Sequence, residues 1–300
     1  MNMRVAITGA TGFIGSHVAV GLARAGHQVV ATGRNPSKVP ALGDVPGIEL
    51  RRGELNDPFS WSDCLERCDA LIHIALGWGE TGLDMLRNDT EASLRLFQAA
   101  VEAGIKRIVY TSSTAACGEM SPLNREDMLP RPVDFYGATK AATESYLRAF
   151  GHKHGISVHV VRPGYVFGEP VVEGADSQPD KRFRDICRAV AKGDPVHLLQ
   201  HDGTQFLHVQ DISRIYLALL SHPVAPSVHY ALSNQWRSWV EVAEIAGQIA
   251  EKTPKIVLED RGYGATPYLF DVSALEKDFG LAFGNLERIR EHVRWELSSP

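Results

Sequence analysis

The sequence has few cysteines, and nothing in their spacing indicates a metal site. Four occur among 300 residues, and none lies in a CxxC pair or fits a zinc-binding spacing. The histidine cluster HKH at 152–154 is typical of a solvated helix end rather than of metal ligands. We therefore expect no bound metal and interpret the thiols as reduced packing groups, which favours a cytoplasmic location. These thiols belong to Cys64, Cys68, Cys117 and Cys187.

Long apolar runs and long basic runs are also missing. No apolar stretch approaches the ~20 residues that a membrane-spanning helix needs, so no membrane partner is expected. The formal net charge is −5, which argues against nucleic acid or an anionic membrane as the main partner. The N-terminal MNMRVAITGATG leads directly into a strand-and-turn pattern, so we expect no secretory leader. A small-molecule ligand is left as the favoured partner.

The chain alternates short β-branched runs with longer helical patterns. Apolar residues follow one another in these runs with little alternation, which is typical of a parallel sheet covered on both faces. Repeated strand–helix units predict right-handed crossovers and hence an α/β fold with a doubly wound, Rossmann-type parallel sheet. The expected strands are 4–8, 28–32, 48–51, 70–74, 107–111 and 157–162, and the expected helices are 14–25, 84–103 and 136–152.

After RPGYVFGEP the regular strand–helix alternation stops, and the sequence predicts a second, smaller unit. We expect a dinucleotide-binding domain made of 1–168 with 204–233, in which VHYALS at 228–233 returns to the main sheet. The remaining segments, 169–203 with 234–300, are predicted to form a discontinuous substrate lobe.

The stretch TGATGFIG follows the first strand and opens the first helix. Its glycines suit a tight turn, a close backbone approach to a pyrophosphate, and close helix–strand packing, in that order. The free N–H groups of the helix N-terminus then favour phosphate. The alternative is an empty strand-to-helix turn. The predicted cofactor-binding residues here are Gly9, Thr11, Gly12, Phe13, Ile14 and Gly15.

The end of the second strand predicts which dinucleotide is bound. An acidic residue at this place would bind the ribose 2′-hydroxyl of NAD. The sequence instead has Gly33 and Arg34, so no carboxylate repels a 2′-phosphate and a guanidinium can pair with it. NADP is therefore favoured over NAD. The alternative is that Arg34 is a surface cation or stacks on the adenine.

The stretch YGATK places Tyr136 and Lys140 one helical turn apart, on the same side. A phenol has an unperturbed pKa near ~10, so its use at neutral pH requires a pKa lower by about three units, or ~4 kcal/mol. One unit charge at ~4 Å and an effective dielectric of ~20 supplies about that much. We therefore predict that Lys140 lowers the pKa of Tyr136 for proton exchange with a substrate oxygen. A chance YxxxK on an exposed helix is the alternative.

A third group is needed to hold the substrate oxygen. YTSST follows the fifth strand at the edge where ligands bind in open α/β sheets, and Ser113 is the predicted donor. Alternatively, its hydroxyl only satisfies a local backbone turn.

Several stretches in one order span nearly the whole chain and resemble the extended short-chain dehydrogenase/reductases, the NAD(P)-dependent epimerase/dehydratase group. The resemblance implies a catalytic Ser113, Tyr136 and Lys140, with the lysine also holding the nicotinamide ribose. It implies a homodimer through helices 84–103 and 136–152, with Glu54 and Leu55 near the adenine and Ala75 and Arg162–Pro163 lining the cleft. The matching stretches are TGATGFIG, GEL, LIHIA, YTSSTAACG, YGATK, VRPGYVFG and FLHVQDIS.

The chain departs from related enzymes in ways that bear on the reaction. The similar 4,6-dehydratases carry Thr-Asp-Glu where this chain has Ser113-Thr114-Ala115, so dehydration is not expected. Enzymes of nucleotide sugars usually place an arginine where this chain has Gln205 and Phe206. In the other direction, PDKRFRD at 179–185 sets cations near a helix start, where an anionic substrate could offset the unfavourable helix dipole. A solvated face balanced by the stretch's own aspartates is the alternative.

Together these features predict an NAD(P)-dependent oxidoreductase that moves hydride between the cofactor and a secondary alcohol or ketone. One alternative is a sugar or nucleotide-sugar 4-epimerase with tightly held NAD. Another, of a different class, is a redox-sensing NADP-binding module without catalysis. Trp78, Tyr165 and Phe167 are predicted to shape the substrate pocket, although apolar walls are equally often ordinary packing.

Overall fold

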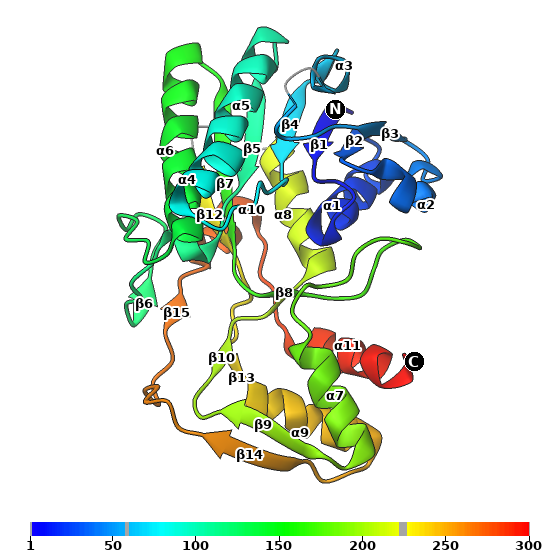
Figure 1. Cartoon of the computed structure of the whole chain (residues 1–300), viewed down its shortest axis with the longest axis vertical. Coiled ribbons are helices and arrows are strands. Elements are labelled where there is room, and N and C mark those ends of the chain that lie inside the picture. The colour runs from blue at the N-terminus through cyan, green and yellow to red at the C-terminus, as the bar shows by residue number, and fades with distance from the viewer. Residues whose placement is uncertain (1, 58–59, 222–226, 300) are drawn as a thin grey trace.

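The computed structural model describes residues 2–57, 60–221 and 227–299. Within these ranges, seven strands form one parallel sheet in the order β12-β7-β5-β4-β1-β2-β3 (Figure 1). The order reverses between β1 and β4, so the carboxyl ends of these two strands make the position where an open α/β sheet binds its ligand. The doubly wound Rossmann-type sheet is confirmed. Its strands are β1 Arg4–Thr8, β2 Gln28–Gly33, β3 Ile48–Arg52, β4 Ala70–His73, β5 Arg107–Thr111, β7 Ser157–Pro163 and β12 Ser227–Ala231.

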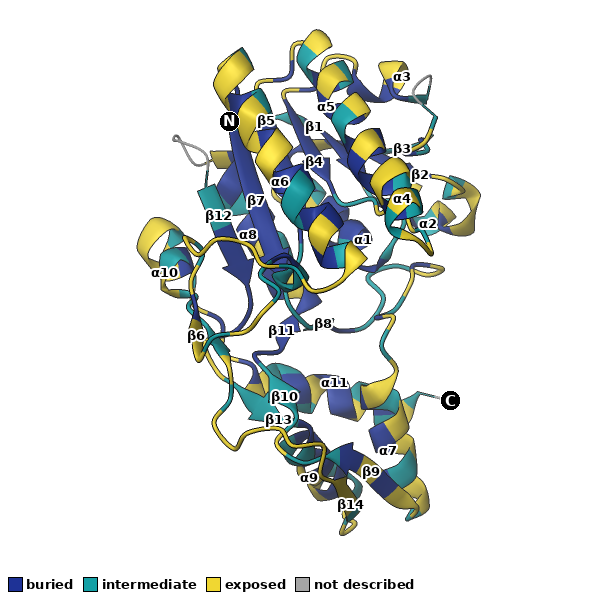
Figure 2. Ribbon diagram, turned by 60° about the vertical axis from the view of Figure 1, so that its left-hand side comes forward, coloured by how far each residue is buried: buried dark blue, intermediate teal, exposed yellow. Residues whose placement is uncertain are grey.

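Helices cover both faces of this sheet, and the strands between them are mostly buried (Figure 2). Two helices pack against each other over one face, and the longer helices α5 and α6 pack side by side over the other. The bounds are α1 Phe13–Arg24 and α8 Val209–Ser221 on the first face, and α3 Ser62–Leu65, α5 Ala92–Glu102 and α6 Phe135–His154 on the second; η1 Pro36–Lys38 and α2 Pro40–Gly43 lie between β2 and β3.

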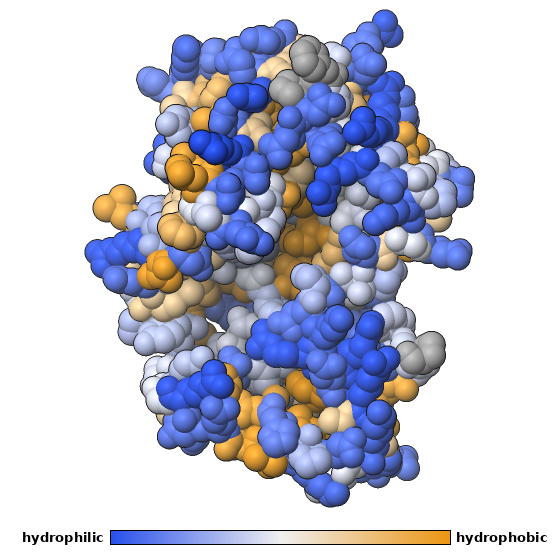
Figure 3. All heavy atoms as spheres, in the orientation of Figure 1, coloured by the Kyte–Doolittle hydropathy of each residue, from blue (hydrophilic) through white to orange (hydrophobic). Residues whose placement is uncertain are grey.

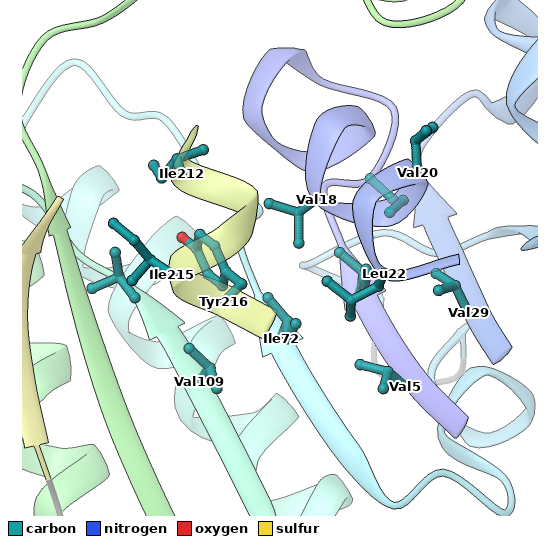
Figure 4. Packing of buried hydrophobic residues seen from close by; sticks show 14 of the residues in the cluster. Val5, Val18, Val20, Leu22, Val29, Ile72, Val109, Ile212, Ile215 and Tyr216 are labelled. Carbon is teal, nitrogen blue, oxygen red and sulfur yellow. The ribbon is translucent and has the colours of Figure 1, made fainter. Parts of the chain in front are cut away.

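The central strand β1 shows why both faces need cover. Val5 and Ile7 pack with Val18 and Leu22 of α1 and with residues of α8 (Figure 4). Ala6, between them, belongs to the separate cluster beneath α5 and α6. Because side chains alternate along a strand, a strand that is apolar throughout must be buried on both sides. This is what the continuous apolar runs predict.

The helix expected over 84–103 has an internal irregularity. It consists of α4 (Gly82–Met85), a six-residue π-helical segment η3 (Leu86–Glu91) and then α5. Asp89 and Thr90 in η3 are both buried. Single π-helical turns inside α-helices are frequent at functional sites, and this one faces α6.

A smaller lobe lies below the sheet domain in Figure 1. Its core packs apolar side chains from three helices and from the segments that enter it, including the rings of Phe183, Trp239 and Phe206. A parallel pair, β9 with β14, covers this core. The lobe elements are α7 Arg182–Lys192, β9 Pro195–Leu199, β13 Arg237–Ser238, α9 Trp239–Ala250, β14 Lys255–Glu259 and α11 Leu286–Ser298.

Short two-stranded pairs join the two parts: β8 (Val166–Phe167) with β11 (Leu207–His208), and β6 (Leu123–Asn124) with β15 (Leu269–Phe270). The expected division into 1–168 with 204–233 and 169–203 with 234–300 stays a prediction. Within the second set, α10 (Ser273–Phe279) packs against β12, so this segment lies on the sheet domain.

A further short pair, β10 (Gly203–Thr204) with β13, completes the connections of the lobe.

No helix in the described ranges combines the length and apolar character that crossing a bilayer requires.

Candidate active site

The glycine turn after β1 is built for close backbone packing. Gly9 has φ +69°, and a Cβ there would lie 2.7 Å from the backbone nitrogen of Ala75. A Cβ on Gly15 would lie 2.1 Å from the Gly9 carbonyl oxygen. Side chains at these two positions would therefore push the first turn of α1 away from β1 and β4. The sequence needs glycine at both places to bring the helix start to the sheet edge.

The N-terminus of α1 is open to a ligand. Gly12 is its N-cap, no side chain in the described ranges caps it, and its first turn carries no acidic residue. The unpaired N–H groups and the helix dipole favour an anion at this point. The turn lines a cleft of about 640 Å³. The space-filling view in Figure 3 shows a hollow between the sheet domain and the lobe.

Most of the predicted cofactor residues line this one cleft. Among the described residues, its lining includes Gly9, Thr11, Gly12, Phe13, Ile14, Gly15, Arg34, Glu54, Leu55, Ala75 and also Trp78. The helix start is open, and the glycine turn leaves no room for side chains. Both features fit the pyrophosphate of a dinucleotide. Sequence reasoning missed the contribution of the loop before α7, from which Asp176 and Pro179 enter the lining.

The end of β2 cannot carry a side chain without a rearrangement. A Cβ on Gly33 would lie 2.3 Å from Oγ1 and 2.6 Å from Cγ2 of Thr11. The carboxylate that would bind the 2′-hydroxyl of NAD is therefore sterically excluded as well as absent. Arg34 is exposed at the cleft, while Glu54 pairs with Arg52 at 3.2 Å.

Ser113, Tyr136 and Lys140 lie together at the carboxyl edge of β5. Ser113 begins η4 (Thr114–Ala116) and its Oγ accepts the N–H of Ala115 at 3.1 Å. The same hydroxyl lies close enough to the Tyr136 phenol to lower the pKa of that phenol. The Lys140 Nζ lies 5.8 Å from the centre of the Tyr136 ring.

Gly137 explains the second letter of YGATK. A Cβ there would lie 2.3 Å from the Ala115 carbonyl oxygen, so glycine lets the first turn of α6 approach the Ser113 turn. The Asp134 Oδ1, which accepts the Gly137 N–H at 2.6 Å, caps the same turn.

The prediction that the charge of Lys140 lowers the pKa of Tyr136 is wrong for the chain's own groups. The Lys140 Nζ pairs with Oδ2 of Asp89 at 3.3 Å, and both side chains are buried. Burial raises the pKa of Tyr136; the Ser113 hydrogen bond lowers it, and the charges of Asp89 and Asp134 raise it further. The phenol is therefore protonated at neutral pH.

Sequence reasoning did not identify Asp89, although a signal was present. Met85, Asp89, Ala92 and Leu96 recur at helical spacing and are all buried. A carboxylate on such a face needs a buried cation, and Lys140 on the adjacent helix supplies it.

Of the three predicted pocket residues, one lies at the cleft and two pack in the lobe core. Trp78 is 66% exposed, and its ring centre lies 6.4 Å from that of Tyr136, so it stands beside the phenol. Phe167 is fully buried and stacks on Phe183 in the lobe core, which removes it from any pocket wall. The ring of Tyr165 also packs in that core, with the Arg182 guanidinium over it at 5.2 Å.

Arg162, Pro163 and Gln205 lie away from the cleft lining in the described residues. Arg162, expected to line the cleft beside Pro163, is buried and pairs with Glu144 of α6 at 2.7 Å. Pro163 ends β7 and is absent from the described cleft lining. Gln205 is buried, where it accepts the Phe270 N–H at 2.7 Å and holds β15.

The cations before α7 are mostly paired within the protein. Arg182 pairs with Asp180 at 2.7 Å, and Arg184 pairs with Glu296 of α11 at 3.2 Å. Lys181 is exposed. The contacts favour the interpretation of a locally balanced face over a built anion site.

Comparison with known proteins assigns the family. A model of the NAD dependent epimerase/dehydratase family matches residues 5–232. The chain belongs to this family. The UDP-glucose 4-epimerase of Azospirillum brasilense is 29% identical, over 97% of this chain and 86% of its own length. The dihydroflavonol 4-reductase of Zea mays is 26% identical, over 93% of this chain and 83% of its own length.

Solved structures agree with this assignment. MoeE5 in complex with UDP-glucuronic acid and NAD has a TM-score of 0.80 at 28% identity, covering 97% of this chain and 98% of that one. RMD from Pseudomonas aeruginosa, complexed with NADPH, has a TM-score of 0.77 at 25% identity, covering 99% and 98%. The expected extended short-chain dehydrogenase/reductase type is confirmed, and with it an NAD(P)-dependent enzyme.

Proposed function

We propose that this member of the family catalyses hydride transfer between a nicotinamide cofactor and a secondary alcohol or ketone, with Ser113, Tyr136 and Lys140 as the reacting machinery. The observation that carries the proposal is that the Ser113 hydroxyl and the Tyr136 phenol lie together, with Tyr136 beside Trp78, which lines the glycine-turn cleft. When bound, the cofactor supplies or accepts the hydride.

The chain's own groups handle the proton and the orientation. Ser113 donates a hydrogen bond to the substrate oxygen, and Tyr136 gives that oxygen its proton during reduction. Because burial raises the pKa of Tyr136, the phenol is in its acid form at neutral pH, which suits ketone reduction. Lys140 holds the nicotinamide ribose and Trp78, beside the phenol, forms part of the substrate wall.

We propose NADP rather than NAD as the preferred cofactor. The exclusion of a side chain at position 33 by Thr11, with Arg34 exposed beside it, supports this choice. A guanidinium there pairs with a 2′-phosphate. An exchangeable NADP also fits net reduction better than a retained cofactor would.

Sugar 4-epimerisation is the second candidate, and the UDP-glucose 4-epimerase relative favours it. The two functions differ in what happens to the cofactor. A reductase consumes NADPH in proportion to substrate, whereas an epimerase leaves the cofactor unchanged over a full cycle.

The experiment is a screen of ketones, flavanones and UDP-sugars with the purified protein, following absorbance at 340 nm and the products. Net NADPH oxidation supports the reductase; UDP-sugar interconversion with NAD(H) retained through dialysis replaces it with the epimerase.

We further propose a homodimer through α5 and α6. The two helices pack side by side over one sheet face, and their outer surface exposes Tyr146. Sedimentation of the purified protein at micromolar concentration tests this state, and a monomer mass would contradict it.

A further inference from the structure

Asp89 is a fully buried carboxylate with two polar partners at the candidate site. Its Oδ2 lies 3.3 Å from Nζ of Lys140, and its Oδ1 accepts the backbone N–H of Gly77 at 2.9 Å. Lys140 itself is only 2% exposed, and its ammonium lies 5.1 Å from the centre of the Tyr110 ring. The ammonium therefore has little access to water, and its charge depends on protein partners.

A second carboxylate is close, but it is already engaged. Glu144 accepts two hydrogen bonds from Arg162, at 2.9 and 2.7 Å, and another from Ser112. Burial lowers the pKa of Lys140, and the charge and hydrogen bond of Asp89 oppose that effect more than Glu144 does. The charged or titratable groups that face the pair are Asp134, Tyr136 and Glu144 at α6, Tyr110 on β5, His73 on β4 and Arg162 behind Glu144 on β7.

The other oxygen of Asp89 fixes the loop that carries Trp78. A Cβ on Gly77 would lie 1.8 Å from the carbonyl oxygen of Asn88, so this loop runs directly against the π-helical segment η3. The Asn88 side chain donates to the Trp78 carbonyl at 2.9 Å. One carboxylate thus connects the wall of the cleft to α6.

We propose that Asp89 is a positioning residue: its carboxylate keeps the buried Lys140 ammonium charged and in place, and it ties the Gly77–Trp78 loop to the same point. This inference rests on the proposed function for the role of Lys140, but the charge pair can be tested without turnover. A family member that lacked this carboxylate would need another way to keep the lysine protonated.

The decisive variant is Asp89→Asn, which keeps an oxygen for the Gly77 N–H and removes the charge. The Lys140 ammonium is titrated by NMR on protein with 13Cε-labelled lysine, with Lys140→Arg identifying the signal. We expect the midpoint to fall by at least one pH unit, a tenfold weaker affinity for the proton. Glu91→Gln, which removes an exposed carboxylate of the same segment, should leave it unchanged. Equal midpoints in wild type and Asp89→Asn would overturn the proposal.

A double-mutant cycle keeps the test decisive if Asp89→Asn folds poorly. Removing one member of a buried ion pair leaves an uncompensated charge, whereas removing both does not. The Lys140→Met, Asp89→Asn double variant should therefore unfold at higher urea than Lys140→Met alone. Additive losses would reject the pairing. Neither measurement involves hydride transfer, so a failure of the proposed function would appear separately, as an inactive enzyme with these results intact.

Discussion

Cofactor choice depends on two adjacent positions, Gly33 and Arg34, and the structure indicates how to reverse it. An aspartate at 33 would bring its Cβ to 2.3 Å from Oγ1 of Thr11, so the single change should disturb the glycine turn. Thr11→Ala removes both overlapping γ atoms and leaves the Thr11 Cβ at 3.0 Å. The double variant Thr11→Ala, Gly33→Asp should therefore bind NADH better than Gly33→Asp alone.

The magnitude for Arg34 follows from its charge. Two unit charges ~4 Å apart in water interact by about 1 kcal/mol, and a 2′-phosphate carries nearly two. Arg34→Ala should thus weaken NADPH binding by about 2 kcal/mol, roughly thirtyfold in Kd, and leave NADH binding nearly unchanged. Fluorescence titrations with NADPH and NADH at fixed ionic strength measure both values, with Arg24→Ala on the last turn of α1 as the control. A wild type that prefers NADH, or an unchanged preference in Arg34→Ala, would show that Arg34 does not select the cofactor.

Two stability predictions concern buried titratable groups. Burial lowers the pKa of His17 from 6.5 to about 4, so only the unfolded chain gains this proton as pH falls through that range. As pH falls through this range, the free energy of unfolding should fall by up to ~3 kcal/mol. The urea midpoint should therefore depend less on pH in His17→Gln than in wild type, whereas the exposed His152→Gln should behave as wild type. The same pH dependence in His17→Gln and wild type would contradict this. Arg162→Met should lower the free energy of unfolding by ~3–5 kcal/mol, because it leaves the buried Glu144 carboxylate without its cation. Adding Glu144→Gln should restore part of this stability. Urea unfolding measures both variants, and additive losses would exclude coupling between the two residues.

Features that depend only on the local sequence could be predicted. The strands of the sheet, from β1 to β7, begin and end within two residues of the expected bounds because buried parallel strands are apolar throughout. The glycine turn was also predictable, since Gly9 has φ +69° and Gly15 packs against the Gly9 carbonyl oxygen within the same turn. These features need no knowledge of distant partners.

Features that depend on partners far apart in the chain could not be read this way. Asp89 meets Lys140 across 51 positions, and Arg162 turns to Glu144 instead of to the cleft. Phe167 lies in a stretch that resembles a pocket wall, yet it is buried in the lobe core. Local spacing identifies which side chains carry chemistry, but tertiary packing decides which of them pair with each other.

In the proposed reaction, the Tyr136 phenol exchanges the proton during hydride transfer. Tyr136→Phe removes only the hydroxyl, and Tyr146→Phe, on the exposed side of the same helix, is the matched control. The direct measurement is single-turnover hydride transfer with whichever substrate the screen identifies, alongside NADPH titration. We expect a 10²–10⁴-fold slower transfer in Tyr136→Phe, with cofactor affinity and the control unchanged. Hydride transfer at the wild-type rate in Tyr136→Phe would contradict the claim.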